Sequence, residues 1–135
     1  MRKVLVFGTF DIFHEGHRNF LKQAQRHGDF LRVVIARDAN VEKIKKQRSV
    51  NNEQERLQKV VKSGLADEVV LGSLTDKYDV IKEFRPDVIC LGYDQKFFID
   101  NLRGKLNEFG LQNTEVVRLK AYHPEEYKSS KLRNH

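Results

Sequence analysis

Apolar runs and amphipathic segments alternate along the whole chain. Short apolar runs predict buried strands at 3–7, 30–36, 67–72, 87–92 and 114–119. Apolar residues at helical spacing, together with helix start and stop residues, predict helices at 16–27, 40–46, 53–64 (capped by Asn52), 77–84, 97–109 and 129–134. Because parallel strands need long crossovers, strands separated by helices predict a parallel sheet with right-handed connections and helices on both faces.

The expected fold class is therefore α/β, with a Rossmann-like, doubly wound, five-stranded parallel sheet. The length of 135 residues fits a single domain, 1–135, with one core. A sheet of this kind binds ligands beyond the carboxyl ends of its strands.

Composition limits where in the cell we expect the protein to be found. No apolar run approaches the roughly 20 residues that span a bilayer, and Met1–Lys3 leads directly into a strand-like run without a signal-peptide pattern. We therefore expect a cytoplasmic protein without a membrane partner. Cys90 is the only cysteine, which excludes an intrachain disulfide, and its apolar neighbours predict a buried thiol.

The formal net charge of +6 favours an anionic partner, such as a nucleotide, a sugar phosphate or a nucleic acid. Lysines and arginines are spread along the chain, and the one dense cluster is EKIKKQR at 42–48. Aromatic residues do not interleave with a basic face, so small anionic substrates are favoured over DNA or RNA.

Polar and unusual residues follow most of the predicted strands. The segments are GTFDIFHEGH (8–17), RDANVEKIKK (37–46), GYDQKF (92–97) and KAYHPEEYKSSK (120–131). Since the carboxyl ends of parallel strands share one edge of the sheet, these segments converge there. Their convergence predicts a ligand site at that edge.

The first of these segments carries the most specific chemistry. A glycine at position 8 lets a ligand approach the backbone, and the helix start near Gly16 offers N–H groups to an anion. His14 and His17, three residues apart, can point their imidazoles in the same direction. Two imidazoles beside such a helix start suit polyphosphate chemistry, where they donate hydrogen bonds to phosphate oxygens and, when protonated, offset growing negative charge.

Other readings of the two histidines fit less well. Zinc needs three or four ligands, and no cysteine or third histidine lies at a suggestive spacing, so no residue is predicted to bind a metal. The GxGxxG and Walker patterns are absent, which argues against NAD and P-loop sites.

The segment GTFDIFHEGH resembles the signature of the nucleotidylyltransferase superfamily, H-x-G-H after a strand that carries G-x-F-D. The matching residues are Gly8, Phe10, Asp11, His14, Gly16 and His17. The wider segment 5–38 resembles the glycerol-3-phosphate cytidylyltransferases and the archaeal-type FAD synthases. LGYDQKF resembles the FAD synthases, whereas the cytidylyltransferases tend to have G-D-D-W there.

This resemblance implies the HIGH-type nucleotidyltransferase fold and a reaction without a covalent enzyme intermediate. A phosphate oxygen of an acceptor attacks the α-phosphorus of a nucleoside triphosphate, and pyrophosphate leaves. Mg²⁺ is the expected cofactor, held mainly by the triphosphate. A homodimer is expected by analogy with small members of the superfamily.

The resemblance also assigns roles to residues of this chain. The catalytic residues it implies are His14, His17, Lys45 and Lys46, with Lys43 as a further candidate in the basic loop. The nucleotide-binding residues it implies are Gly8, Thr9, Phe10, Gly16, Gly92, Asp94, Lys128, Ser129 and Ser130. Asp38 is expected to hold the acceptor or a metal-bound water. Arg56 is expected to bind the acceptor phosphate, the alternative being a surface arginine paired with Glu53. Asp11 is expected to fix the turn through hydrogen bonds to backbone.

Two departures from the superfamily pattern bear on the substrate. Lys128 stands where the C-terminal signature has its first hydroxyl, and HPEE replaces the R-T-E-G of the cytidylyltransferases. An FMN adenylyltransferase, converting ATP and FMN to FAD and pyrophosphate, is therefore the first hypothesis. The alternatives are a CTP-dependent enzyme acting on glycerol 3-phosphate or a related polyol phosphate, and a catalytically silent nucleotide sensor.

Overall fold

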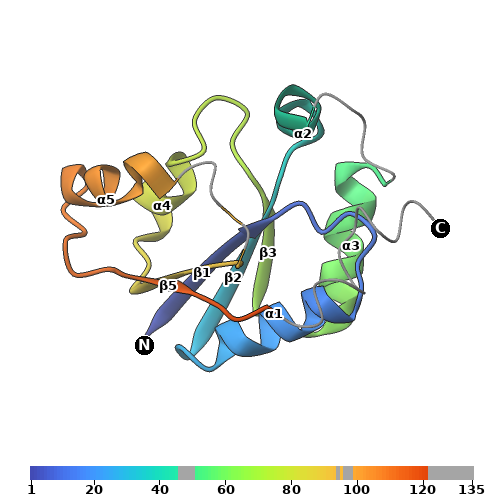
Figure 1. The fold of residues 1–135 in the computed structure, drawn as a ribbon, viewed down its shortest axis with the longest axis horizontal. Coiled ribbons are helices and arrows are strands. Elements are labelled where there is room, and N and C mark those ends of the chain that lie inside the picture. Colours follow the sequence, from blue (N-terminus) through green and yellow to red (C-terminus); the bar gives the residue numbers. More distant parts are fainter. Residues whose placement is uncertain (46–50, 94, 96–98, 122–135) are drawn as a thin grey trace.

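The sheet of this protein is entirely parallel and has five strands in the order β3-β2-β1-β4-β5 (Figure 1). The computed structural model describes residues 1–45, 51–93, 95 and 99–121. The strands are β1 (Lys3–Gly8), β2 (Phe30–Ile35), β3 (Glu68–Leu71), β4 (Val88–Leu91) and β5 (Glu115–Arg118). The helices are α1 (Glu15–Gln25), α2 (Asp38–Lys45), α3 (Glu53–Ser63), α4 (Asp79–Phe84) and α5 (Ile99–Glu108).

The α/β fold expected from the sequence is confirmed, with each described element within a few residues of its predicted range. Helices α4 and α5 begin two residues after their predicted starts, whereas α2 begins two residues before its predicted start, at Asp38. An acidic side chain in the first turn suits the positive end of a helix, which the apolar pattern alone did not reveal. The helix predicted at 129–134 lies outside the described residues.

Helices cover both faces of the sheet, because side chains alternate along each strand. Val4 and Val6 of β1 face one core cluster, which α1 and α3 complete with residues such as Leu21 and Val60. Leu5 faces the other cluster, which contains side chains of α4 and α5. Figure 1 shows α1 and α3 on one side of the sheet and α4 and α5 on the other.

Cys90 is fully buried in the first of these clusters, as predicted. Burial is the main reason that the pKa of its thiol rises to about 12, so the thiol stays protonated at neutral pH. The residue is therefore part of the core packing.

The strand order indicates where on the sheet a ligand would bind. From central β1 the chain proceeds outward through β2 to β3, then returns to add β4 and β5 on the other side. The carboxyl ends of β1 and β4 therefore meet at the point where the direction of winding reverses, the usual place for a ligand in such folds.

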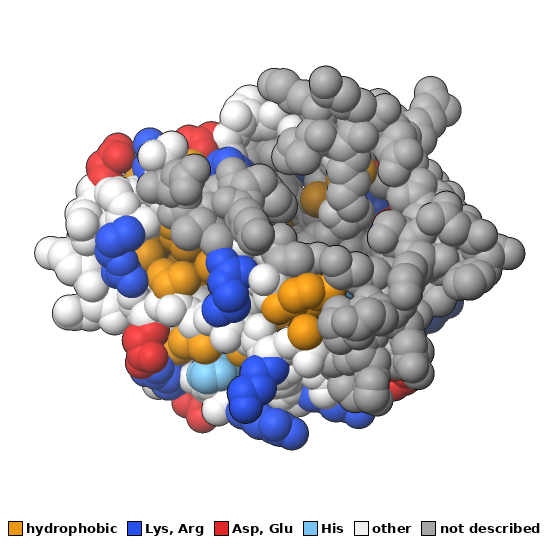
Figure 2. All heavy atoms as spheres, viewed as in Figure 1, with side chains coloured by type: hydrophobic (Ala, Val, Ile, Leu, Met, Phe, Trp, Pro, Cys, Tyr) orange, Lys and Arg blue, Asp and Glu red, His pale blue; other side chains and the backbone are white. Residues whose placement is uncertain are grey.

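Figure 2 shows how charged side chains are distributed on one face of the molecule. On the part of the face in Figure 2 that is coloured, Lys and Arg side chains are separated by hydrophobic and uncharged surface rather than gathered in one stripe. Among the described residues, no helix has the length and apolar character that crossing a membrane requires.

Candidate active site

His14 and His17 lie together at the start of α1. His14 is the N-cap of this helix, with extended backbone (φ −140°, ψ −176°), and its Nδ1 accepts the Gly16 N–H at 3.0 Å. Nδ1 of His17 accepts the His14 N–H at 3.3 Å, which completes a reciprocal capping arrangement. The two imidazole rings stack, with centroids 3.9 Å apart and planes 24° from parallel.

These hydrogen bonds fix the tautomer of both rings. Because each Nδ1 accepts a backbone N–H, the proton of each neutral ring is carried by Nε2. Burial lowers the pKa of His14, and the opposing effect of Glu15 is smaller. At neutral pH His14 is thus a neutral Nε2–H donor rather than an imidazolium.

Aromatic side chains hold the His17 ring from two sides. Phe13 stacks on it, with centroids 5.7 Å apart and planes 15° from parallel, and Phe10 meets it edge-on at 5.3 Å. The Phe10 ring is buried, only 3% exposed. Its side chain therefore supports His17 from the core, and only its backbone is available to the nucleotide role expected for Phe10.

Gly8 has a packing role as well as a place beside the ligand site. A Cβ added at Gly8 would lie 2.5 Å from the ring of Phe10, so any side chain there would collide with that ring. Gly16 likewise has a role inside the protein, because its N–H donates to His14. The nucleotide contacts expected of both glycines stay predictions.

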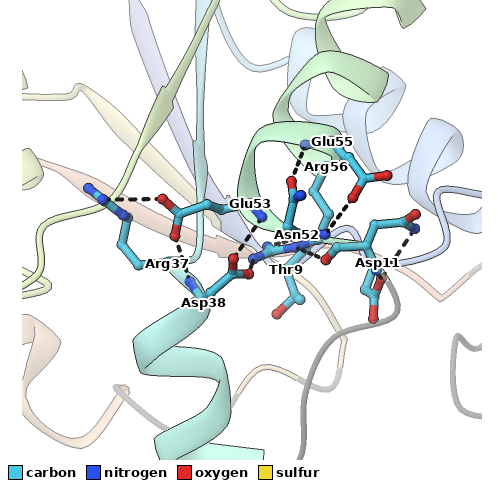
Figure 3. A network of polar contacts seen from close by, with 9 residues as sticks. Thr9, Asp11, Arg37, Asp38, Asn52, Glu53, Glu55 and Arg56 are labelled. Carbon is cyan, nitrogen blue, oxygen red and sulfur yellow. Dashed lines mark hydrogen bonds and ion pairs between the residues drawn. The ribbon is translucent and has the colours of Figure 1, made fainter.

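A polar network joins the loop after β1 to the starts of α2 and α3 (Figure 3). Arg56 lies fully buried at its centre, with its guanidinium donating to the Thr9 carbonyl at 2.8 Å and to the Asp38 carboxylate at 2.7 Å. The alternative reading of Arg56, as a surface residue paired with Glu53, is wrong. The side chain is fully buried, and Asp38 is its ionic partner.

Asp38 links the two helix starts reciprocally. Its carboxylate accepts the Glu53 N–H at 3.1 Å, and its own N–H donates to the Glu53 carboxylate at 2.8 Å. Burial would raise the pKa of Asp38, but hydrogen bonds from Arg56 and the Glu53 N–H, with the charges of Arg56 and Arg37, lower it overall. Asp38 is therefore ionised at neutral pH.

Asp11 is a structural residue. It is 3% exposed, and its carboxylate accepts the backbone N–H of Asn51 at 2.9 Å. The predicted bond to backbone is present, but the partner lies before α3 rather than within the turn of Asp11 itself. Asp11 therefore ties the histidine loop to the same segment that carries Arg56.

A pocket of about 440 Å³ opens at the carboxyl edge beside this network. Its apolar walls include Phe7 at the end of β1, Val34 of β2 and Tyr78, while the segment after β3 closes one side. In that segment, residues 72–78, the hydroxyl of Ser73 accepts the N–H groups of Thr75 and Asp76. The sequence analysis did not assign residues 72–78 to the site, because their turn-forming residues are typical of any surface loop.

Gln95 connects the pocket to the end of β4. Its carbonyl oxygen accepts the Gly92 N–H at 2.8 Å, and its amide donates to the Phe7 carbonyl at 2.8 Å. Arg118 donates to the Gly92 carbonyl at 2.5 Å. Gly92, expected to bind nucleotide, is thus held from two sides by residues that sequence reasoning did not assign to the site.

The structure describes only some of the remaining predicted site residues. Lys45 ends α2 and Lys43 lies within it. The residues outside the described ranges are Lys46, Asp94, Lys128, Ser129 and Ser130. Their expected roles stay predictions.

Comparison with known proteins places the chain in a family. The model of the family described as cytidylyltransferase-like matches residues 5–135. The chain belongs to the cytidylyltransferase-like family. The resemblance stated from the sequence is thereby confirmed, and the protein is a nucleotidyltransferase.

Individual proteins match this chain over most of its length. An FAD synthase from Methanosarcina barkeri is 44% identical over 119 residues, which are 88% of this chain and 84% of that protein. An FAD synthase from Methanosarcina acetivorans is 46% identical over 119 residues, 88% of this chain and 77% of that protein. Among solved structures, a lipopolysaccharide core biosynthesis protein from Thermoplasma volcanium aligns with a TM-score of 0.83 and 36% identity over 90% of this chain and 98% of that one.

Proposed function

We propose that this protein is an FAD synthase, which transfers the adenylyl group of ATP to FMN and releases pyrophosphate. The observation that carries the proposal is the identity of 44% to an FAD synthase over 88% of the chain. The apolar pocket of about 440 Å³ supports it, because pockets for small ligands are lined mainly by apolar side chains and measure roughly 300–1,000 Å³.

In the proposed reaction the pocket holds FMN with its phosphate toward Gly8 and Thr9. A phosphate oxygen of FMN forms a bond to the α-phosphorus of ATP, and the bond from that phosphorus to the β-phosphate oxygen breaks. The electron pair of the broken bond leaves on pyrophosphate. The Nε2–H groups of His14 and His17 donate to the phosphate oxygens on which negative charge grows.

Preorganisation explains why a neutral His14 suits this task. Stacked rings with centroids 3.9 Å apart would repel each other if both were protonated. With His14 neutral that repulsion is absent, and backbone hydrogen bonds fix both rings before substrate arrives.

Mg²⁺ fits this site as a partner of the triphosphate, whose negative charge it would offset. Among the described residues, no group of three or more His, Cys, Asp and Glu side chains could hold a metal ion. The remaining assignments belong to the same proposal: Lys45 and Lys46 at the triphosphate, Gly92 and Asp94 at the nucleoside, and Lys128, Ser129 and Ser130 at the phosphates. A cytoplasmic homodimer is proposed as well, and light scattering tests the dimer.

An assay with four substrate pairs tests the function. The protein is incubated with Mg²⁺ and either ATP or CTP, each with FMN or glycerol 3-phosphate, and products are separated by chromatography. FAD and pyrophosphate from ATP and FMN support the proposal. A CDP-activated product would instead make the protein a cytidylyltransferase, and no turnover with any pair would favour a nucleotide sensor.

A further inference from the structure

Arg56 projects from the first turn of α3 into the interior of the protein. Its side chain has no solvent exposure. Its Nε donates to the Asn51 carbonyl at 3.1 Å, one terminal nitrogen to the Thr9 carbonyl at 2.8 Å and the other to Asp38 at 2.7 Å. A buried guanidinium is costly unless such acceptors surround it, so these bonds hold the side chain in this position.

The three acceptors come from three segments that are distant in sequence. Thr9 belongs to the loop after β1, Asp38 begins α2 after β2, and Asn51 precedes α3. Figure 3 shows the guanidinium between the first two, with the polar side chains of the α3 start around it. The fork of Arg56 therefore sets the spacing between the histidine loop and the two helix starts.

The loop that Arg56 holds is strained. Phe10 and Ile12 have positive φ angles of 54° and 56°, a conformation that non-glycine residues adopt only when their surroundings impose it. Arg56 fixes the carbonyl just before Phe10, and Asn51 fixes Asp11 just after it. The conformation held in this way places the Phe10 ring against His17.

The network also reaches the opposite wall of the pocket. Asp38 pairs with the start of α3 at Glu53, and Glu53 forms an ion pair with Arg37 at 3.2 Å. Arg37 lines the pocket and donates to the carbonyl of Gly72, at the end of β3. One chain of contacts thus runs from the histidine loop to the far wall.

We propose that Arg56 is a positioning residue, which aligns the His14–His17 pair with the acceptor pocket, and that Asp38 holds its guanidinium in place. This role replaces direct contact with the acceptor phosphate, which would require the network to open. The inference rests on the proposed transfer reaction, because alignment matters only where the two imidazoles and the acceptor act on one phosphorus atom.

The first arm of the test reads the histidine rings without any reaction. Spectra of protein with isotope-labelled histidine report the ring nitrogens of His14, His17 and His27. Arg56→Lys keeps the positive charge but loses the fork, so the signals of His17 should move while those of distant His27 stay. Arg103→Lys, at an exposed position on α5, should move neither. Unmoved His17 signals in folded Arg56→Lys would overturn the proposal.

The second arm separates positioning from substrate binding through kinetics. For Arg56→Lys we expect kcat to fall at least about tenfold while the KM for FMN changes less than about twofold. A raised KM for FMN with unchanged kcat would make Arg56 a phosphate clamp and overturn the proposal. If Arg56→Lys does not fold, the same spectra and kinetics are measured on Asp38→Asn. This substitution should be tolerated, because the Asp38 side chain is 37% exposed.

The two arms distinguish the possible failures. If the wild-type protein makes no FAD, the proposed function fails. The spectra of Arg56→Lys and Asp38→Asn still decide whether the network sets the histidine geometry, and the kinetic arm then uses whichever substrate pair turns over.

Discussion

His14 caps the helix on which His17 lies, and His17 in turn accepts the backbone N–H of His14. The same two contacts that begin α1 therefore orient both imidazoles. Helix formation and preparation of the reaction site are one event, since neither ring can turn without breaking a bond at the helix start. This coupling leads to a test that separates the two roles of His14.

Substituting His14 by two different residues should separate capping from catalysis. Asparagine is a favoured N-cap residue and alanine is not, so His14→Ala should lose about 1 kcal/mol of unfolding free energy and His14→Asn much less. Both variants lack the Nε2–H donor, and both should lose about 10²–10³-fold in kcat. Urea unfolding and initial rates measure the two effects. Retained activity in His14→Asn would show that the cap, not the donor, is what the reaction needs.

The lowered pKa of His14 predicts a defined acid limb. Its ordinary value is 6.5, and burial shifts the folded-state pKa below that value. The unfolded chain therefore takes up this proton first as pH falls, so the contribution of His14 to stability is present above 6.5 and is lost as pH falls through the folded pKa. Rates of adenylyl transfer should likewise decline only below 6.5, as imidazolium forms.

Two measurements check this pH dependence. One is the pH profile of kcat/KM, and the other is the titration of the His14 ring by NMR. In His14→Asn the unfolding free energy should lose this part of its pH dependence. An acid limb centred above 6.5 in both measurements would contradict the assignment of a neutral donor.

Some features of the fold and site were predictable because they depend on residues that are close in sequence. The alternation of apolar runs and helical segments is a local pattern. It predicts a parallel sheet, because the helices provide the long crossovers that connect parallel strands. The Gly8–His17 segment is contiguous, so its histidines could be recognised directly. Their position at the carboxyl edge follows from chain direction alone.

Other features depend on contacts between distant segments, and local patterns do not contain them. Arg56 lies between Glu55 and Leu57 in a helix rich in polar residues, and its burial follows only when Thr9 and Asp38 converge on it. The cap at His14 was missed because histidine is not among the usual N-cap residues. The pocket wall at 72–78 was missed because its function depends on facing Phe7 and Val34 across the sheet edge.

Gly8 should not tolerate even a methyl group. Its Cβ would lie 2.5 Å from the Phe10 ring, which packs against His17, so Gly8→Ala should push the ring and disturb His17. We expect a loss of about 1–3 kcal/mol in unfolding free energy, together with a loss of activity.

Gly104→Ala is the matched control for this substitution. A Cβ at that helical position meets nothing within 4 Å, so stability should be unchanged or should rise by up to about 1 kcal/mol. Thermal unfolding and initial rates compare the two variants. If Gly8→Ala behaved like Gly104→Ala, the packing argument for Gly8 would be wrong.

Filling the pocket should affect the acceptor and not the nucleotide. Ala36 lines the pocket just beyond the end of β2, and leucine at this position would place three more carbon atoms in its volume of about 440 Å³. If FMN binds there, Ala36→Leu should raise the KM for FMN at least about tenfold, because a ring lying against that wall would collide with the added atoms. The KM for ATP should change less: Gly8 and Thr9, expected at the nucleotide, line the pocket, but the two imidazoles and the start of α1 do not. Val61→Leu, at an exposed position on α3, serves as a control that should alter neither constant. A raised KM for ATP with an unchanged KM for FMN would place the nucleotide in the pocket and reverse the proposed arrangement of the two substrates.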